Sequence, residues 1–278
     1  MTTLAIPDDD AIDVFRTCIS KVRDKDLKNR LSEIEYLIAK TAAEYRKKAE
    51  ATKLFRLKPM HCAGDVKKDE LTSVYTSRFA LKGSPGRHIY DRLKNAPAHG
   101  RCPLCWQRTV GTLDHYLPKA EFPIYSVLPI NLIPACIDCN KLKSDEVPRK
   151  ASEQTIHPYF DNFEDDRWLV ASHKEDDPYT VRFSTDPPDK WTSIAKKRLQ
   201  KHFQTFELGV LYSSHAAVEI EGIIPRLKNI KRIAGTCGVK THLHEEWESR
   251  LNARTNSWQT ALYCELSSNK WFYSGGFE

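Results

Sequence analysis

The chain has 278 residues, of which 40% are hydrophobic and 29% are charged, with 11 Gly and 15 Pro. This composition is typical of an ordered protein of one large or two modest domains, and it excludes collagen-like and low-complexity chains. Lysine and arginine exceed aspartate and glutamate by 43 to 37, and the net charge of +6 is compatible with a polyanionic partner without requiring one.

Membrane and secretion signals are not apparent in the sequence. No apolar run approaches the ~18 residues that a membrane helix needs, and the N-terminal residues lack the basic flank and apolar segment of a signal peptide. We therefore expect a cytoplasmic protein without a membrane partner. In such a compartment, closely spaced cysteines indicate metal binding rather than disulfides.

The N-terminal part is predicted to be helical. Apolar residues recur at helical spacing from Asp10 to about Leu57, which predicts one or two amphipathic helices with a basic polar face. Residues 58–82 are predicted to be looser. Ser84 can then cap, and Pro85 can open, a short helix that continues to Lys94.

The C-terminal part is predicted to contain a small hairpin and three helices. Residues 167–171 and 179–183 are strand-like and flank an acidic turn. Periodic stretches predict helices over 191–211, 216–234 and 243–266, with a break around Gly235–Gly238. Residues 190–206 and 225–240 each carry five Lys or Arg and no Asp or Glu.

Four of the 8 cysteines form two Cys-x-x-Cys pairs, Cys102 with Cys105 and Cys136 with Cys139. Two residues between cysteines allow both sulfurs to bind one ion, so the two pairs predict a tetrahedral structural Zn²⁺ site. A redox dithiol and chance burial are the alternatives. The long interval between the pairs implies an inserted substructure.

That inserted segment carries a family pattern. Asp114-His115 is followed by Asn131-Leu132, and the second cysteine pair leads into Asn140-Lys-Leu-Lys-Ser-Asp145. In this order the segment resembles the HNH endonucleases in their zinc-stapled form, and its tail is similar to the end of the HNH domain in RNA-guided CRISPR nucleases. The chain also resembles uncharacterised bacterial HNH proteins linked to phage defence, through the sequence His157-Pro-Tyr-Phe-Asp161.

The resemblance implies a role for each motif residue. It implies that His115 is the general base, that Asp114 and Asn140 bind a divalent metal, and that Asn131 orients the base. Asparagine replaces the histidine that is common at the last position, and two oxygen ligands favour Mg²⁺ or Mn²⁺. A bend or bulge is expected at the strand end, because adjacent strand residues face opposite ways.

Simpler interpretations remain open for these residues. His115 can also be a core or solvated histidine, Asn131 a turn residue, and Asn140 the N-cap of a helix. Phosphate contacts are expected from five basic residues on two helices: Lys141, Lys143, Lys196, Lys197 and Arg198.

The predicted fold is α+β and mostly helical, with a central ββα-metal unit and a four-cysteine zinc site between helical flanks. The expected regions are a helical segment 1–98, an HNH core 99–160, and a hairpin with helices over 161–278. The predicted function is a metal-dependent HNH endonuclease acting on DNA, with RNA not excluded and with a partner ATPase or other defence-system subunit as a further expected partner. The alternative is a catalytically silent zinc module that binds nucleic acid or a protein.

Overall fold

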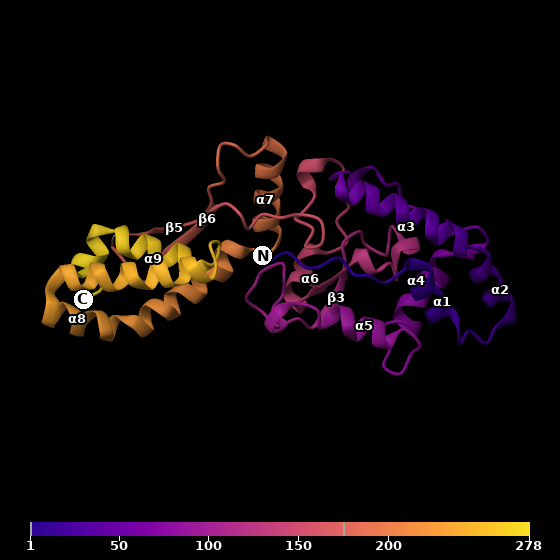
Figure 1. Cartoon of the computed structure of the whole chain (residues 1–278), viewed down its shortest axis with the longest axis horizontal. Helices are drawn as coiled ribbons and strands as arrows, with labels where there is room; N and C mark the ends of the chain where they lie inside the picture. Colours follow the sequence, from indigo (N-terminus) through magenta and orange to yellow (C-terminus); the bar gives the residue numbers. More distant parts are fainter. Residues whose placement is uncertain (1, 175) are drawn as a thin grey trace. The chain divides into compact units, whose positions relative to one another are not determined.

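A computed structural model describes residues 2–174 and 176–278. The chain forms two compact units, Met1–Asn162 and Phe163–Glu278, called unit 1 and unit 2 below (Figure 1). Helices dominate, and the strands among the described residues form three two-stranded antiparallel sheets. The expected mostly helical α+β class is confirmed. The helices of 1–98 and the cysteine-containing segment 99–160 lie together in unit 1.

Unit 1 begins with three helices where one or two are expected. They are α1 (Ala11–Ile19), α2 (Lys25–Glu33) and α3 (Glu35–Glu50). The side chains of Asp10 and Asp24 accept hydrogen bonds from the first backbone N–H groups of α1 and α2, which satisfies donors that a helix start leaves free. A turn at Ile34 separates α2 from α3.

The segment expected to be loose contains a hairpin and a helix. Strands β1 (Cys62–Ala63) and β2 (Val66–Lys67) lead directly into α4 (Lys68–Arg78). The apolar face of α4 is short, and Thr and Ser, which are poor helix formers, occupy much of its length. Its burial of Leu71, Val74 and Tyr75 therefore comes from tertiary packing that local sequence does not indicate.

Helix α5 (Arg87–Lys94) follows the expected course with a different start. Gly86, and not Ser84, is its N-cap. A Cβ atom at Gly86 would lie 2.8 Å from Cys18 Sγ and 2.8 Å from a ring carbon of Phe79, so packing excludes a side chain there. The buried Ser84 Oγ has no hydrogen-bond partner among the described residues, so the predicted capping role of Ser84 is wrong.

The centre of unit 1 is a two-stranded sheet followed by a helix. Strand β3 (Thr112–His115) pairs antiparallel with β4 (Leu132–Ala135), and α6 (Ile137–Lys143) starts two residues later. The register is regular at all positions from Thr112 opposite Ala135 to His115 opposite Leu132. β3 therefore contains no bulge and ends at His115, and the expected bend follows at Tyr116 and Leu117. Residues of β4 are all buried, so this hairpin lies in the core.

Among its described residues, unit 2 contains one hairpin, three α-helices and a π-helix of 5 residues, Phe272–Gly276. The strands and α-helices are β5 (Leu169–His173), β6 (Val181–Thr185), α7 (Ser193–Thr205), α8 (Leu208–Ala253) and α9 (Trp258–Ser268). Both strands start two residues later than expected. Just before β5, Asn256 Oδ1 accepts the backbone N–H of Trp168 at 2.9 Å, a contact from distant sequence. Among the described residues, no helix combines the length and low charge needed to cross a membrane.

The helices of unit 2 divide at one of the expected points and at two others. The expected helix 191–211 is broken at Glu207, whose φ of 49° is left-handed. The expected break near Gly235 is confirmed: Gly235 has φ 63° and ψ −166°, and α8 folds back there, so that Arg250 Nη2 lies 3.6 Å from Glu219 Oε1 (Figure 1). Residues 243–253 belong to α8 and not to α9.

Candidate metal centre and active site

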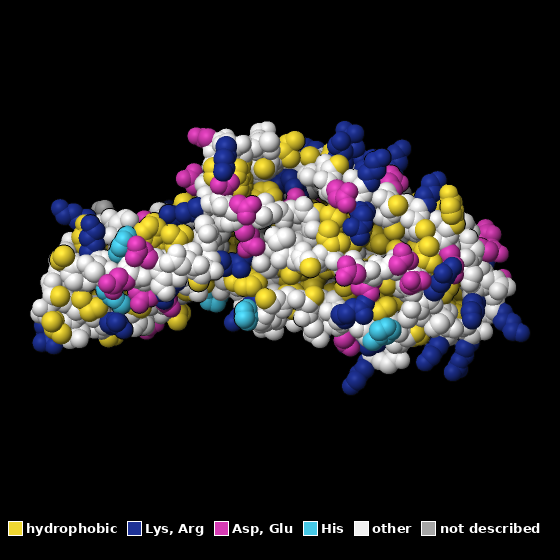
Figure 2. Space-filling view, viewed as in Figure 1, with side chains coloured by type: hydrophobic (Ala, Val, Ile, Leu, Met, Phe, Trp, Pro, Cys, Tyr) yellow, Lys and Arg dark blue, Asp and Glu magenta, His cyan; other side chains and the backbone are white. Residues whose placement is uncertain are grey.

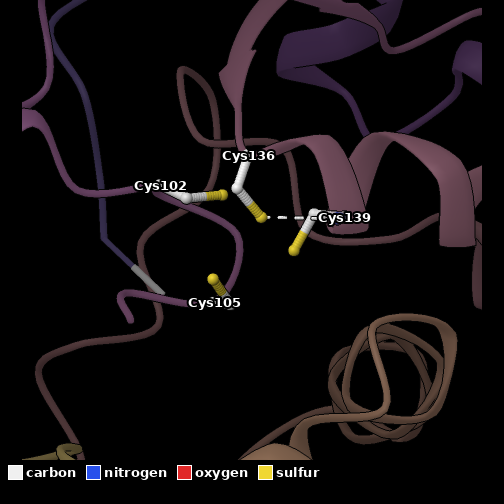
Figure 3. Close-up of side chains that lie close together, drawn as sticks. All are labelled: Cys102, Cys105, Cys136 and Cys139. Carbon is white, nitrogen blue, oxygen red and sulfur yellow. Dashed lines mark hydrogen bonds between the residues drawn. The ribbon is translucent and has the colours of Figure 1, made fainter. Parts of the chain in front are cut away.

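The four predicted zinc ligands converge on one point in unit 1. All four cysteines are buried, and their sulfur atoms lie within 4.8 Å of one another (Figure 3). Cys102 and Cys105 lie in the turn before β3, Cys136 is the N-cap of α6, and Cys139 lies within α6. The cluster therefore joins the chain before the hairpin to the helix after it.

The chemistry of the cluster fits a metal such as zinc. Hydrogen bonds among the sulfurs raise the pKa of Cys102 and Cys139 and lower the pKa of Cys105 and Cys136. Four thiols this close are well suited to a divalent cation, which binds them as thiolates and releases their protons. Cys136 Sγ also accepts a hydrogen bond from the backbone N–H of Cys139 at 3.3 Å, which orients the second pair (Figure 3).

An ion pair next to the cysteines adds a second link that the sequence did not reveal. Arg108, just after the first cysteine pair, contacts Asp138, inside the second, with an Nε to Oδ2 distance of 2.9 Å. Burial lowers the pKa of Arg108, but the charges of Asp138 and of the cysteines outweigh this effect, so the pKa is raised. Four thiolates with one divalent ion keep a net negative charge, and the Arg108 guanidinium offsets part of it.

His115 is held in one ring orientation. Its Nε2 lies 2.9 Å from the backbone carbonyl oxygen of Ser126, and that carbonyl can only accept, so we assign the proton to Nε2. The ring packs edge-on against Tyr75 at a centroid distance of 4.4 Å. Burial lowers the pKa of His115 to about 3, so the imidazole is neutral at physiological pH. Nδ1 then carries the lone pair that can accept a proton.

Asp114 points to a different neighbour. Its carboxylate lies 3.2 Å from Nζ of Lys143 on α6, and both side chains are buried. Burial raises the pKa of Asp114, and the Lys143 charge opposes this effect. Lys143 also donates to the backbone carbonyl of His115 at 2.6 Å. Lys143 is expected from the sequence to contact phosphate at the surface. In the structure it is instead buried and paired with Asp114.

Asn131 is completely buried and holds the connection between β3 and β4. Its Oδ1 accepts the backbone N–H of Leu117 at 2.8 Å and the hydroxyl of Tyr45 at 3.0 Å. Its Nδ2 donates to the carbonyls of Leu117 at 3.1 Å and Tyr125 at 3.2 Å. The contacts fix the chain just before Ser126, the residue that binds His115. These hydrogen bonds of Asn131 thus reach the chain next to Ser126 and do not involve the His115 side chain.

Replacing Asn131 by alanine should destabilise unit 1 by about 3–5 kcal/mol, because several buried backbone and hydroxyl groups would lose their partner at roughly 1–3 kcal/mol each. Urea unfolding followed by tyrosine and tryptophan fluorescence would measure the change. The control is Asn95→Ala at the exposed C-terminal end of α5. A loss for Asn131→Ala as small as that of the control would contradict the assignment.

Asn140 lies on α6, half-buried, one helical turn before Lys143. Cys136 is the N-cap of this helix, so the interpretation of Asn140 as an N-cap is wrong. Lys141 on the same helix is exposed. Asn140 and Lys143 are three residues apart on α6 and share a helix face.

The basic residues predicted on α7 differ in exposure. Lys197 is exposed, and Lys196 is half-buried with its Nζ 3.1 Å from Asp189. Arg198 is only 4% exposed, so its predicted role as a surface phosphate contact is wrong. On a helix, Arg198 lies next to the buried Leu199 and one turn before the buried His202, which explains why it turns inward.

Two site residues escaped sequence reasoning. Tyr75 comes from α4, and Ser126 presents a backbone carbonyl, a group that no sequence pattern marks. Ser126 Oγ in turn donates to the carbonyl of Leu71 on α4 at 3.0 Å, so α4 supports both contacts of His115.

Comparison with known proteins finds a distant relative. Protein ea31 of Escherichia phage lambda is 28% identical over 226 residues, covering 76% of this chain and 76% of that protein. No family model matches the chain. No solved structure matches it either. The name of the relative states no activity, so the case for a function rests on the residues of unit 1.

Proposed function

We propose that unit 1 is a metal-dependent HNH endonuclease that hydrolyses phosphodiester bonds in DNA. The observation that carries the proposal is the geometry at His115, whose Nε2 is fixed on the backbone carbonyl of Ser126 and whose ring packs on Tyr75, so that Nδ1 is left to accept a proton. It lies next to a buried carboxylate, on a hairpin tied to its helix by four cysteines. These are parts that phosphodiester hydrolysis requires.

In the proposed reaction, His115 Nδ1 takes a proton from a water molecule as the water oxygen bonds to phosphorus. The bond between phosphorus and the leaving sugar oxygen breaks, and that oxygen takes a proton from solvent. Positioning comes from Ser126 and Tyr75, which prevent rotation of the ring. Asp114 and Asn140 provide hard oxygen ligands that would hold Mg²⁺ or Mn²⁺, and such an ion supplies charge neutralisation at the phosphate and leaving oxygen. The cysteine cluster would hold structural Zn²⁺ and keep α6 against β3.

One observation favours the alternative, a silent zinc module that binds nucleic acid or a protein partner. The Asp114 carboxylate already has a cationic partner in Lys143. A module of this kind would keep the zinc cluster and bind without cleaving. The relative in a phage lends no support to a role in host defence or to a partner ATPase, and we leave both out of the proposal.

Incubation of the purified protein with supercoiled plasmid, single-stranded DNA and RNA distinguishes a nuclease from a silent zinc module. We expect cleavage of DNA with Mg²⁺ or Mn²⁺ and none with EDTA, at unchanged zinc content. The rates on the three substrates identify the preferred nucleic acid. Binding without cleavage of any substrate would support the silent module instead.

Basic side chains on unit 1 provide a surface for the nucleic acid backbone. Figure 2 shows many Lys and Arg side chains over α3, interleaved with acidic ones. Among them, Lys40, Arg46 and Lys47 are exposed. Because phosphate contacts release bound counter-ions, affinity for DNA should fall steeply as salt rises.

Lys141→Gln should lower the slope of log affinity against log salt by about 0.9, the value for one phosphate contact on duplex DNA. Lys197→Gln tests the predicted contact on α7 in the same way. Filter binding across a salt series measures both. Lys82→Gln, at another exposed lysine of unit 1, is the control. If Lys141→Gln has the same slope as wild type, Lys141 does not contact phosphate.

A further inference from the structure

The ammonium group of Lys143 lies where a cation bound by Asp114 would lie. Nζ is 3.2 Å from Oδ2 and 3.4 Å from Oδ1 of Asp114, so it contacts both carboxylate oxygens. A third hydrogen bond, 2.6 Å long, goes to the His115 carbonyl. The two side chains are 8% and 7% exposed. The pair is therefore buried and well coordinated.

A buried carboxylate without a positive partner is unstable, because burial disfavours its charged form. Lys143 provides the needed charge in the free protein. A divalent ion at the same oxygens would serve the same purpose, and the ion and the ammonium would repel each other at this separation. Asn140, one turn earlier on the same helix face, offers the amide oxygen that an incoming ion could use.

We infer that Lys143 is an exchangeable counter-ion of Asp114, which a divalent cation must displace in order to bind. The inference rests on the proposed function and adds that Lys143 regulates metal binding at Asp114. Metal affinity is then low in the free protein. It rises when a phosphate anion draws the released ammonium outward. Metal and substrate binding are coupled through one side chain.

Mn²⁺ binding to the zinc-loaded full chain tests this, with the signal of free Mn²⁺ in electron paramagnetic resonance as the readout. Lys143→Gln should bind Mn²⁺ at least about fivefold more tightly than wild type, the lower range of typical coupling between sites. Lys143→Arg keeps the charge and should bind like wild type. Lys141→Gln removes an equal charge from the exposed face of α6 and serves as the matched control. Equal or weaker Mn²⁺ binding by Lys143→Gln would overturn the inference.

Chemical modification of the wild-type chain gives a test that needs no variant. Acetylation of lysines, read by mass spectrometry, should leave Lys143 protected without metal and modify it several times faster at saturating Mg²⁺. Lys141 should react equally in both conditions. Continued protection of Lys143 at saturation would contradict displacement. If Lys143→Gln binds Mn²⁺ more tightly but the wild type cleaves no nucleic acid, the proposed function fails and this inference stands. If the wild type cleaves DNA but Lys143→Gln binds Mn²⁺ no more tightly than wild type, the proposed function stands and this inference fails.

Discussion

Alanine at His115 should slow DNA cleavage by about 10²–10⁴-fold, the usual contribution of a general base. The imidazole supplies the Nδ1 lone pair that takes the proton, and a methyl side chain cannot replace it. Zinc content and affinity for DNA should stay close to wild type, because the His115 ring contacts Ser126 and Tyr75 and not the four cysteines. Single-turnover cleavage of a labelled duplex at saturating protein measures the change.

The matched control is His88→Ala, at an exposed histidine of α5 in the same unit. It should cleave like wild type. Cleavage by His115→Ala within a few fold of His88→Ala would remove His115 from the reaction.

Serine at Cys136 should reduce zinc from about one ion per chain to nearly none and unfold the hairpin region locally, because structural zinc binding is coupled to folding. The substitution is selective. Serine is a good N-cap and can still accept the Cys139 N–H at the start of α6, so the capping contact survives while the thiolate ligand is lost. Elemental analysis and hydrogen exchange over residues 100–143 measure the two effects.

Cys62→Ser is the control, because Cys62 is an exposed cysteine outside the cluster. Full zinc content is expected for it. Retention of zinc by Cys136→Ser, or wild-type protein purified without zinc, would show that the cluster does not hold the ion.

The cysteine cluster could be predicted from the sequence, and its confirmation has a simple physical reason. Each Cys-x-x-Cys pair is a local turn, and metal chemistry demands that two such turns meet. The prediction therefore needed no knowledge of the path between Cys105 and Cys136. The cysteine spacing implied only an inserted substructure; the expectation of a hairpin and a helix came from the resemblance to HNH endonucleases.

The surroundings of His115 could not be predicted in this way. Its partners are a backbone carbonyl at Ser126 and a ring from α4, a helix whose Thr- and Ser-rich sequence shows little amphipathic pattern. Such contacts are set by tertiary packing, and local sequence does not encode them.

Charge counting failed at Lys143 and Arg198 for one shared reason. A run of basic residues on a helix indicates a basic helix, but it does not say which side chains face the core. Lys143 turns inward because Asp114 is buried opposite it, and Arg198 because its helix buries the adjacent Leu199. In the free protein, the candidates for phosphate contacts are the exposed Lys141 and Lys197 and the half-buried Lys196.

Under the proposed function, unit 1 holds two chemically different cation sites, one of sulfur and one of oxygen. Crystals of the protein grown with Mn²⁺, measured at the zinc and manganese absorption edges, test for both sites at once. We expect a zinc peak among the four cysteine sulfurs and a manganese peak at the Asp114 carboxylate, with Lys143 moved away. Zinc absent from the cysteines, or manganese bound elsewhere with the Lys143–Asp114 pair intact, would contradict the two-site proposal.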